Sequence, residues 1–384
     1  MTFLHDLAFT PATMAVIPVL ETTILFLAGQ ILLIATLFHL LPGLTRRDIL
    51  FAVTVDPAYR KTAESRRVVR QFRIAVWIHS AVGTALVFAG AATSHLSIPF
   101  VGVLWQLVGA MIAFLRARKQ TLPHAVSQTA RREAVLVRRS AGVGYWLLQL
   151  GPFAILAASA FYLKYNWQRI PERFPVHWGL SGEPDGWATR SFTGVYAPLL
   201  IAFAVCALIA VLSYAILHWT RQVRATGPAG QAEGHFRQVQ FGILLAVQYF
   251  LAGTLSGVPI LALRAHQESA PGIGPFLVGT FVFVLVIFAI LIYTGQGGAN
   301  LAEAAIGSDI VKDRPVTGDR TPDQCWKAGM FYVNPDDPAL LVEKRFGVGY
   351  TINFGHPAAW IVISILVALA VVPLIISFFP AHSH

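Results

Sequence analysis

Long, uncharged apolar segments dominate this chain and limit what it can fold into. A helix that crosses a lipid bilayer needs about 20 mostly apolar residues. Eight segments approach or exceed this length, at residues 14–41, 73–92, 98–115, 144–163, 194–218, 239–263, 276–294 and 357–379. They do not alternate apolar and polar residues as the strands of a membrane barrel do. The sequence therefore predicts an all-α transmembrane helix bundle of about eight spans.

The composition agrees with a membrane location. Only 12% of the 384 residues are charged, and the mean hydropathy is +0.61, whereas soluble domains carry about 25% charged residues. The formal net charge of +10 would also suit nucleic-acid binding, but in a membrane protein it is typical of basic cytoplasmic loops. We therefore expect the lipid bilayer as a partner, and no nucleic acid.

Lysine and arginine are distributed unevenly between the two sides of the predicted bundle. The connecting segments on one side hold 22 of them, and those on the other side hold five. Because basic residues concentrate in cytoplasmic loops, we expect segments 42–72 and 296–356 in the cytoplasm and segment 164–193 outside. Both termini should then be extracytoplasmic. No Lys or Arg precedes the first apolar run, which argues against a cleaved signal peptide.

A dense polar segment, residues 170–190, lies between two apolar runs. Its three prolines interrupt any helix, and its "SGEP" and "PDG" sequences predict turns. Phe174, Val176 and Trp178 alternate with other residues, which predicts a short strand that leads into a turn. One interpretation is a compact cap over the outer mouth of the bundle, held by interfacial tryptophans.

The other interpretation of this segment is a recognition surface for an extracellular peptide. Its candidate residues are His177, Trp178, Glu183, Asp185, Trp187 and Arg190. An imidazole with two carboxylates is also a possible metal site, but all three ligands would come from one turn without the spacing of a zinc helix. We therefore expect no metal here.

Segment 296–356 is predicted to be a small β-containing cytoplasmic module. Its "NPDDP" sequence (334–338) favours a turn, and "GMFYV" and "GVGYTINF" are rich in aromatic and β-branched residues, which predicts two short strands. Asp336 and Asp337 alone supply too few ligands for a divalent cation. The chain also lacks the Gly-x-Ser-x-Gly and His-Glu-x-x-His motifs of hydrolases, so we expect no enzyme activity and no cofactor.

Glu21 is the only carboxylate that we place inside a predicted span. It lies about seven residues into the first apolar segment, roughly 10 Å deep at 1.5 Å per residue. Intramembrane ionisable residues are functional candidates by default, so Glu21 is either paired, protonated or exposed to a wet cavity. The glutamines inside predicted spans, among them Gln106, Gln149 and Gln248, are expected to join helices by hydrogen bonds.

The outward segment resembles a bacterial membrane domain of unknown function that is shared with the SdpI family, whose namesake is a bacteriocin-immunity protein. The matching residues are Ile170, Pro171, Pro175, His177, Gly182, Glu183, Pro184, Asp185, Trp187 and Arg190. The resemblance implies a bacterial inner-membrane protein of immunity or signalling type that protects against a toxic envelope-active peptide. It implies that peptide and a cytoplasmic regulator as partners.

Two further segments support a longer relative of that family. Residues 50–60 are similar to the first cytoplasmic loop of long members, and residues 326–360 resemble a second uncharacterised domain that is often joined to the first. The motif residues of this second resemblance that we take as candidate site residues are Trp326, Tyr332, Asn334, Asp336, Asp337, Lys344 and Arg345.

The sequence predicts five regions and leaves three functions open. The regions are three N-terminal spans (1–141), the SdpI-like domain (142–220), two further spans (221–295), the cytoplasmic module (296–356), and the last span with an outward tail (357–384). The leading function is immunity or signalling. The alternatives are a proton- or ion-coupled transporter or channel-like protein, and a structural or assembly factor of the envelope.

Overall fold

The computed structural model describes residues 11–93, 95, 97–126, 143–178, 184–219, 227–263, 274–296 and 321–378. For residues 11–23 it describes the backbone alone. The described part contains eight helices, which are α1 (Pro11–Leu44), α2 (Ala63–Thr93), α3 (Ser97–Thr121), α4 (Val143–Tyr165), α5 (Phe192–Trp219), α6 (Gly227–Ala262), α7 (Gly274–Thr294) and α9 (Pro357–Phe378).

Seven of these helices, α1 to α7, contain stretches that are long and apolar enough to cross a membrane. In α9 the described side chains give a shorter apolar stretch, Pro357–Ala368. The helical, multi-pass membrane architecture that the sequence predicts is therefore confirmed, with seven candidate spans in the described part of the chain.

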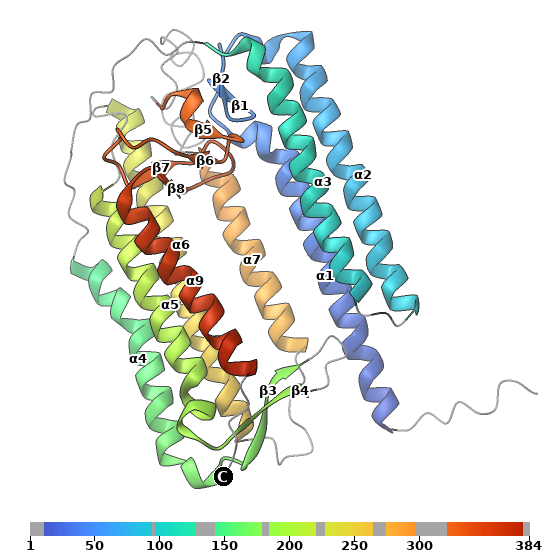
Figure 1. Cartoon of the computed structure of the whole chain (residues 1–384), viewed down its shortest axis with the longest axis vertical. Coiled ribbons are helices and arrows are strands. Elements are labelled where there is room, and N and C mark those ends of the chain that lie inside the picture. Colours follow the sequence, from blue (N-terminus) through green and yellow to red (C-terminus); the bar gives the residue numbers. More distant parts are fainter. Residues whose placement is uncertain are drawn as a thin grey trace, which may run out of the picture.

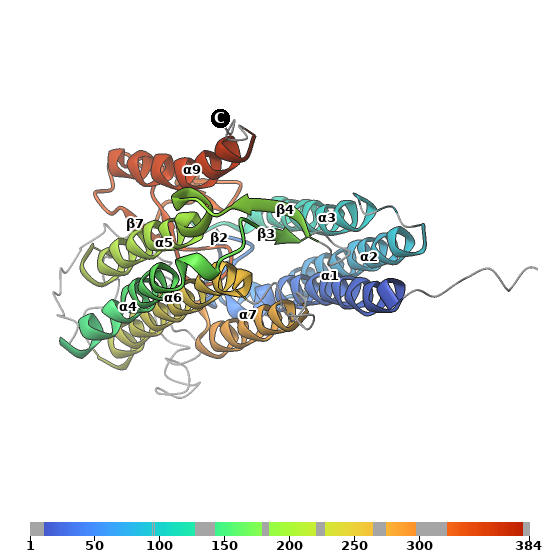
Figure 2. The ribbon, with the colours of Figure 1, turned by 90° about the horizontal axis from the view of Figure 1, so that it is seen from below.

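The helices form two groups, as Figure 1 shows. Helices α1, α2 and α3 pack together, and so do α4, α5 and α6, with α9 against α5. Helix α7 lies between the groups in both views (Figures 1 and 2). Its Phe281 ring lies 6.1 Å from that of Phe26 on α1, and its Phe283 ring stacks at 4.2 Å on Phe250 of α6. Aromatic side chains of α7 thus join the two groups.

Helices α2 and α3 approach each other with their backbones almost in contact. A Cβ atom added to Gly83 would lie 2.7 Å from the carbonyl oxygen of Gly102, and one added to Gly102 would lie 2.5 Å from that of Gly83. Small residues allow such close packing of membrane helices, where van der Waals contact replaces the hydrophobic effect. A larger side chain at either glycine would separate the two helices.

Some helices extend well beyond the apolar segments that the sequence predicts as spans. Helix α2 begins at Ala63 rather than at residue 73, and α6 begins at Gly227 rather than at residue 239. In α2 the added turns carry exposed arginines on one face, while Ser65, Val68 and Phe72 are buried on the other. Because this stretch lacks proline and glycine, the helix continues beyond the apolar segment as an amphipathic extension.

Four short antiparallel hairpins lie at the ends of the helices. They pair β1 (Ile49–Leu50) with β2 (Val53–Thr54), β3 (Arg173–Trp178) with β4 (Pro184–Thr189), β5 (Trp326–Lys327) with β6 (Phe331–Tyr332), and β7 (Leu341–Glu343) with β8 (Tyr350–Ile352). Hairpin β3–β4 lies at one end of the bundle and the other three lie at the opposite end (Figure 1).

The strand predictions are partly confirmed. The strand around Phe174 is β3, and the two predicted strands of segment 296–356 contain β6 and β8. The "PDG" turn is wrong, because Pro184 begins strand β4 and Gly186 pairs with His177. Proline is tolerated as the first residue of a strand because its missing N–H is not needed there. The rest of the predicted "SGEP" turn, residues 181–183, lies outside the described residues.

Candidate functional site

Hairpin β3–β4 is anchored on the ends of three helices. Ile170 and Phe174 are buried in one apolar cluster with Leu163 of α4, Val195 of α5 and Ala252 of α6. Burying such side chains is worth about 1.5–3 kcal/mol each. The hairpin is therefore part of the folded bundle rather than a free loop.

Arg190 holds the base of this hairpin. Its backbone N–H donates to the carbonyl of Glu172 at 2.9 Å, and its guanidinium donates to the carbonyls of Ile170 at 3.0 Å and Gln168 at 3.3 Å. These contacts fix the return of the chain into α5. Of the predicted recognition residues, Arg190 thus has clear stabilising contacts.

The exposed face of the hairpin presents an aromatic ring beside a cation. Trp187 is 48% exposed, and the guanidinium of Arg173 lies 5.1 Å from the centre of its ring. His177 is exposed nearby and is paired with Gly186, and Trp178 is half-buried opposite Pro184. The predicted candidates Glu183 and the side chain of Asp185 lie outside the described residues.

At the opposite end, the module that spans residues 321–356 is built around buried polar side chains. The Tyr332 hydroxyl donates to the Asp337 carboxylate at 3.0 Å. The Asn353 amide donates to the carbonyls of Asn334 at 2.8 Å and Asp337 at 3.0 Å, and its oxygen accepts from the N–H of Asn334 at 3.0 Å. These bonds close the predicted "NPDDP" turn, which the structure confirms. Asp336 is exposed on it.

Arg345 is the largest fully buried side chain of the described residues. It forms an ion pair with Asp323, donates to the carbonyl of Thr321, and lies 5.4 Å from the ring centre of Trp326. Asp323 in turn accepts from the Thr54 hydroxyl at 2.8 Å. The predicted site residues Trp326 and Arg345 are thus brought together, and through Asp323 they hold the α1–α2 connection.

Two tight turns meet beside Arg345. Phe51 and Ala52, in the β1–β2 turn, have φ of 47° and 61°, and Ala328 in the β5–β6 turn has φ of 52°. Left-handed backbone costs a non-glycine residue roughly 1–2 kcal/mol, so surrounding contacts must hold it. A Cβ on Gly329 would lie 2.8 Å from that of Ala52, so the two turns pack tip to tip.

Arg118, at the end of α3, locks these turns together. Its guanidinium donates to the carbonyl of Ala52 at 2.6 Å and of Trp326 at 3.4 Å. Sequence reasoning missed Arg118, Asp323 and Thr54, because their partners are far away along the chain. The only sequence signal is the resemblance of residues 50–60 to a family loop, which does not name a partner.

The remaining candidates differ in their surroundings. Lys344 is half-buried, and burial lowers its pKa from the usual value. Its carbonyl accepts from the side chain of Gln296, just after α7. Glu21 lies in α1, as the sequence predicts, but its side chain is outside the described part. Within the described residues, no group of three or more His, Cys, Asp or Glu is placed to hold a metal ion.

Helices α5 and α6 connect the two ends. Near the hairpin, α5 contributes Val195, and at its other end Ala215 and Ile216 pack against Leu340 and Leu341 of the module. Helix α6 contacts β3 at one end. At the other end its Phe236 ring lies 5.9 Å from that of Tyr350. The predicted recognition residues and the predicted module residues therefore occupy opposite ends of the same two helices.

Comparison with known proteins gives two partial matches. Residues 154–202, which contain the end of α4, the hairpin and the start of α5, match a "Domain of unknown function (DUF1648)". Residues 335–360, which contain β7, β8 and the start of α9, match a "Family of unknown function (DUF5808)". No curated protein and no solved structure matches the chain. The protein is thus a helical, multi-pass membrane-type chain that carries two domains of unknown function, one at each end of its α5–α6 pair.

Proposed function

We propose that this protein is a transmembrane sensor of immunity type. Hairpin β3–β4 would detect a toxic envelope-active peptide outside the inner membrane of a bacterium, and the module would pass the signal to a cytoplasmic regulator. One observation carries the proposal. The same two helices, α5 and α6, contact the hairpin at one end and the module at the other.

The length of α5 suits a direct link across a membrane. It has 28 residues, which correspond to about 42 Å at 1.5 Å per residue, and a bilayer with its headgroups is about 40–45 Å thick. Strand β4 ends at Thr189 and α5 begins at Phe192, so only two residues separate them. A movement of the hairpin is therefore applied directly to the first turn of this helix.

The outer face of the hairpin has the chemistry of a peptide-binding surface. Tryptophan and arginine are the residue types that most often dominate binding energy at protein interfaces, and here Trp187 and Arg173 lie side by side. The resemblance of residues 170–190 to the SdpI immunity family supports a peptide ligand for this face. Trp187 is itself one of the matching residues of this resemblance, and its ring is exposed where a ligand could reach it.

A challenge experiment tests the proposal. A sensitive bacterial host that expresses the protein is exposed to the pore-forming peptides nisin and gramicidin and to the cationic peptide polymyxin B. We expect at least a fourfold rise in the inhibitory concentration of one of them. Trp187→Ala should abolish this protection at equal membrane abundance.

The matched control is Tyr165→Ala. Tyr165 is an aromatic residue at the same end of the bundle, is 83% exposed, and lies at the end of α4 outside the hairpin. This variant should protect as well as the wild type. Equal loss in both variants would point to a general defect and count against recognition by the hairpin, as would the absence of protection against all three peptides.

Coupled proton transport would require ionisable groups inside the membrane spans. The only carboxylate in the seven described spans is Glu64, in the first turn of α2, so these spans offer few groups for a proton relay. Proteoliposomes with a pH-sensitive dye should therefore show no proton flux above empty vesicles. A flux that Glu21→Gln abolishes would establish transport instead of sensing.

A further inference from the structure

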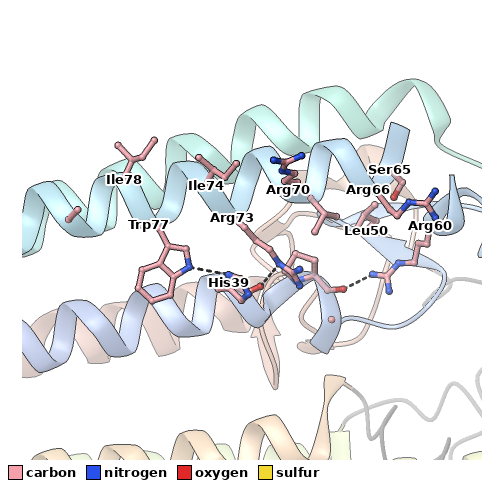
Figure 3. A pocket seen from close by; sticks show the side chains of 14 residues that line it. His39, Leu50, Arg60, Ser65, Arg66, Arg70, Arg73, Ile74, Trp77 and Ile78 are labelled. Atoms are coloured by element: carbon pink, nitrogen blue, oxygen red, sulfur yellow. Dashed lines mark hydrogen bonds between the residues drawn. The ribbon is translucent and has the colours of Figure 1, made fainter. Parts of the chain in front are cut away.

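A groove of about 1030 Å³ lies between the C-terminal end of α1 and the N-terminal half of α2. It lies at the end of the bundle that carries the β1–β2 hairpin. Figure 3 shows Arg73 and Trp77 reaching from α2 toward His39 on α1. The guanidinium of Arg73 donates to the His39 carbonyl, and the Trp77 indole donates to the His39 ring, both at 3.1 Å. These two bonds hold α1 and α2 together at the groove.

The groove carries an excess of positive charge. Arg60, Arg66, Arg70 and Arg73 all line it, and none of its 14 lining residues is acidic. Glu64, in the first turn of α2, is bonded to His124 at 3.1 Å instead. Four cations without a carboxylate in the same groove attract an anion, since charge-assisted hydrogen bonds are about twice as strong as neutral ones.

Backbone carbonyls hold three of these arginines in place without neutralising them. Arg60 donates to the carbonyls of Pro42 at 2.9 Å and Ile49 at 2.7 Å, and Arg66 donates to that of Lys61 at 2.8 Å. Burial lowers the pKa of Arg60 to about 10, with Asp48 opposing the shift and Arg47 adding to it, so the guanidinium stays charged at neutral pH. The cluster is preorganised for an anionic ligand with several acceptor oxygens.

The groove changes from basic to apolar along α2. Its arginines are followed on the same helical face by Ile74, Trp77 and Ile78, which are 48%, 40% and 57% exposed. Arg66 and Ile78 are 12 residues apart, or about 18 Å at 1.5 Å per residue. A charged end followed by an open apolar groove matches a phosphate headgroup followed by acyl chains. A free phosphate ion would make no contact with the apolar part.

From this arrangement we propose that the α1–α2 groove binds one anionic phospholipid, with its phosphate on the arginine cluster and an acyl chain along Ile74 and Ile78. Basic pockets between membrane helices are known to bind anionic headgroups. The arginines line an end that the sequence predicts to be cytoplasmic, where anionic lipids concentrate. The site is separate from the hairpin and needs no peptide ligand.

Native mass spectrometry of the full chain, released from detergent after incubation with lipid, tests this proposal. The wild type should retain phosphatidylglycerol at least tenfold more strongly than phosphatidylcholine. The double variant Arg66→Gln/Arg70→Gln should lose about tenfold or more in affinity, since each basic residue near a charged lipid surface contributes roughly a fivefold factor. Equal retention of the two lipids by the wild type would overturn the proposal.

Two controls separate charge from folding. Arg67 lies on the same helix but does not line the groove, so Arg67→Gln should bind phosphatidylglycerol like the wild type. Arg66→Lys/Arg70→Lys keeps both charges and should retain binding within about threefold. Loss of binding in Arg67→Gln equal to that in the double glutamine variant would show a diffuse surface charge and overturn the site.

A third comparison identifies the source of the phosphate. Inorganic phosphate at 10-fold molar excess over the lipid should not displace phosphatidylglycerol. Ile74→Ser/Ile78→Ser, at two exposed positions, should weaken lipid retention at unchanged melting temperature. Displacement by phosphate, or unchanged lipid retention in the serine variant, would show an anion site and overturn the lipid assignment.

Discussion

Arg345 shows how one buried charge can hold distant segments together. It is fully buried and paired with Asp323, which also binds Thr54. We predict that Arg345→Met lowers the free energy of unfolding by about 3 kcal/mol or more, because removing one partner leaves a carboxylate in a partly buried site. Chemical denaturation in detergent measures this change. The exposed cation Lys327 of the same module is the control, and Lys327→Met should change stability by about 0.5 kcal/mol or less.

Cys325, in the same module, gives a prediction about pH. Burial raises the pKa of its thiol above the usual value, and only the thiolate reacts with maleimides and iodoacetamide. Alkylation of Cys325 should therefore be slow at pH 7. Its rate should still rise at pH values at which the alkylation rate of an exposed cysteine has levelled off. An exposed cysteine at Lys327, in a Cys325→Ser background, gives the reference rate. Equal rates at pH 7 would contradict the prediction.

The sequence predicts individual residues only where their partners are local. Tyr332, Asn334 and Asp337 were predicted as candidate site residues and lie together because they close one turn. Arg118 was not predicted, since its partner Trp326 is 208 positions away. No pattern in a single sequence indicates such a pairing.

At the scale of helices, hydrogen bonds between polar groups join α4, α5 and α6. The Gln149 amide donates to Gln248 at 2.8 Å, and the Gln248 amide donates to the Cys206 carbonyl at 2.7 Å. These bonds link α4, α6 and α5, as predicted for Gln149 and Gln248. The same prediction is wrong for Gln106, whose side chain has no hydrogen-bond partner among the described residues. We predict that Gln248→Leu destabilises the protein by about 1 kcal/mol, a typical value for a hydrogen bond between membrane helices. Thermal unfolding in detergent checks it.

The matched control for this variant is Gln106→Leu. Gln106 on α3 is also fully buried, but within the described chain neither of its side-chain polar atoms has a hydrogen-bond partner. Replacing it removes the cost of burying unpaired polar atoms, so this variant should be as stable as the wild type or more so. A larger loss for Gln106→Leu than for Gln248→Leu would contradict the assigned bonds.

Element prediction succeeded where one physical constraint dominates. Apolar length alone located the membrane helices, because the bilayer requires about 20 apolar residues per span. It did not predict how far α2 and α6 continue beyond the apolar segments, because there helix propensity and packing decide the boundary. The β1–β2 turn was also missed, since Phe51 and Ala52 adopt left-handed backbone that neither residue type favours.

At the scale of the whole molecule, the two ends of the bundle differ in structure, and the sequence predicts that they differ in their content of lysine and arginine. Hairpin β3–β4 is at one end and the module is at the other (Figure 1), and lysine and arginine predict which end is cytoplasmic. In a variant without native cysteines, Thr189→Cys should react with an impermeant maleimide in intact cells. Lys327→Cys should react only after permeabilisation. Both positions are exposed, so the reverse pattern would overturn the orientation.

We infer that α5 and α6 couple the hairpin to the module. Arg190→Ala removes the side-chain bonds that hold the hairpin base, and hydrogen–deuterium exchange in lipid nanodiscs measures the response at the other end. We predict faster exchange in the module at the amides of Asn353 and Phe354, which donate to the carbonyls of Leu340 and Tyr332. Helices α2 and α3 should not change, and neither should the Tyr165→Ala control. Faster exchange confined to the hairpin, with an unchanged module, would contradict the coupling.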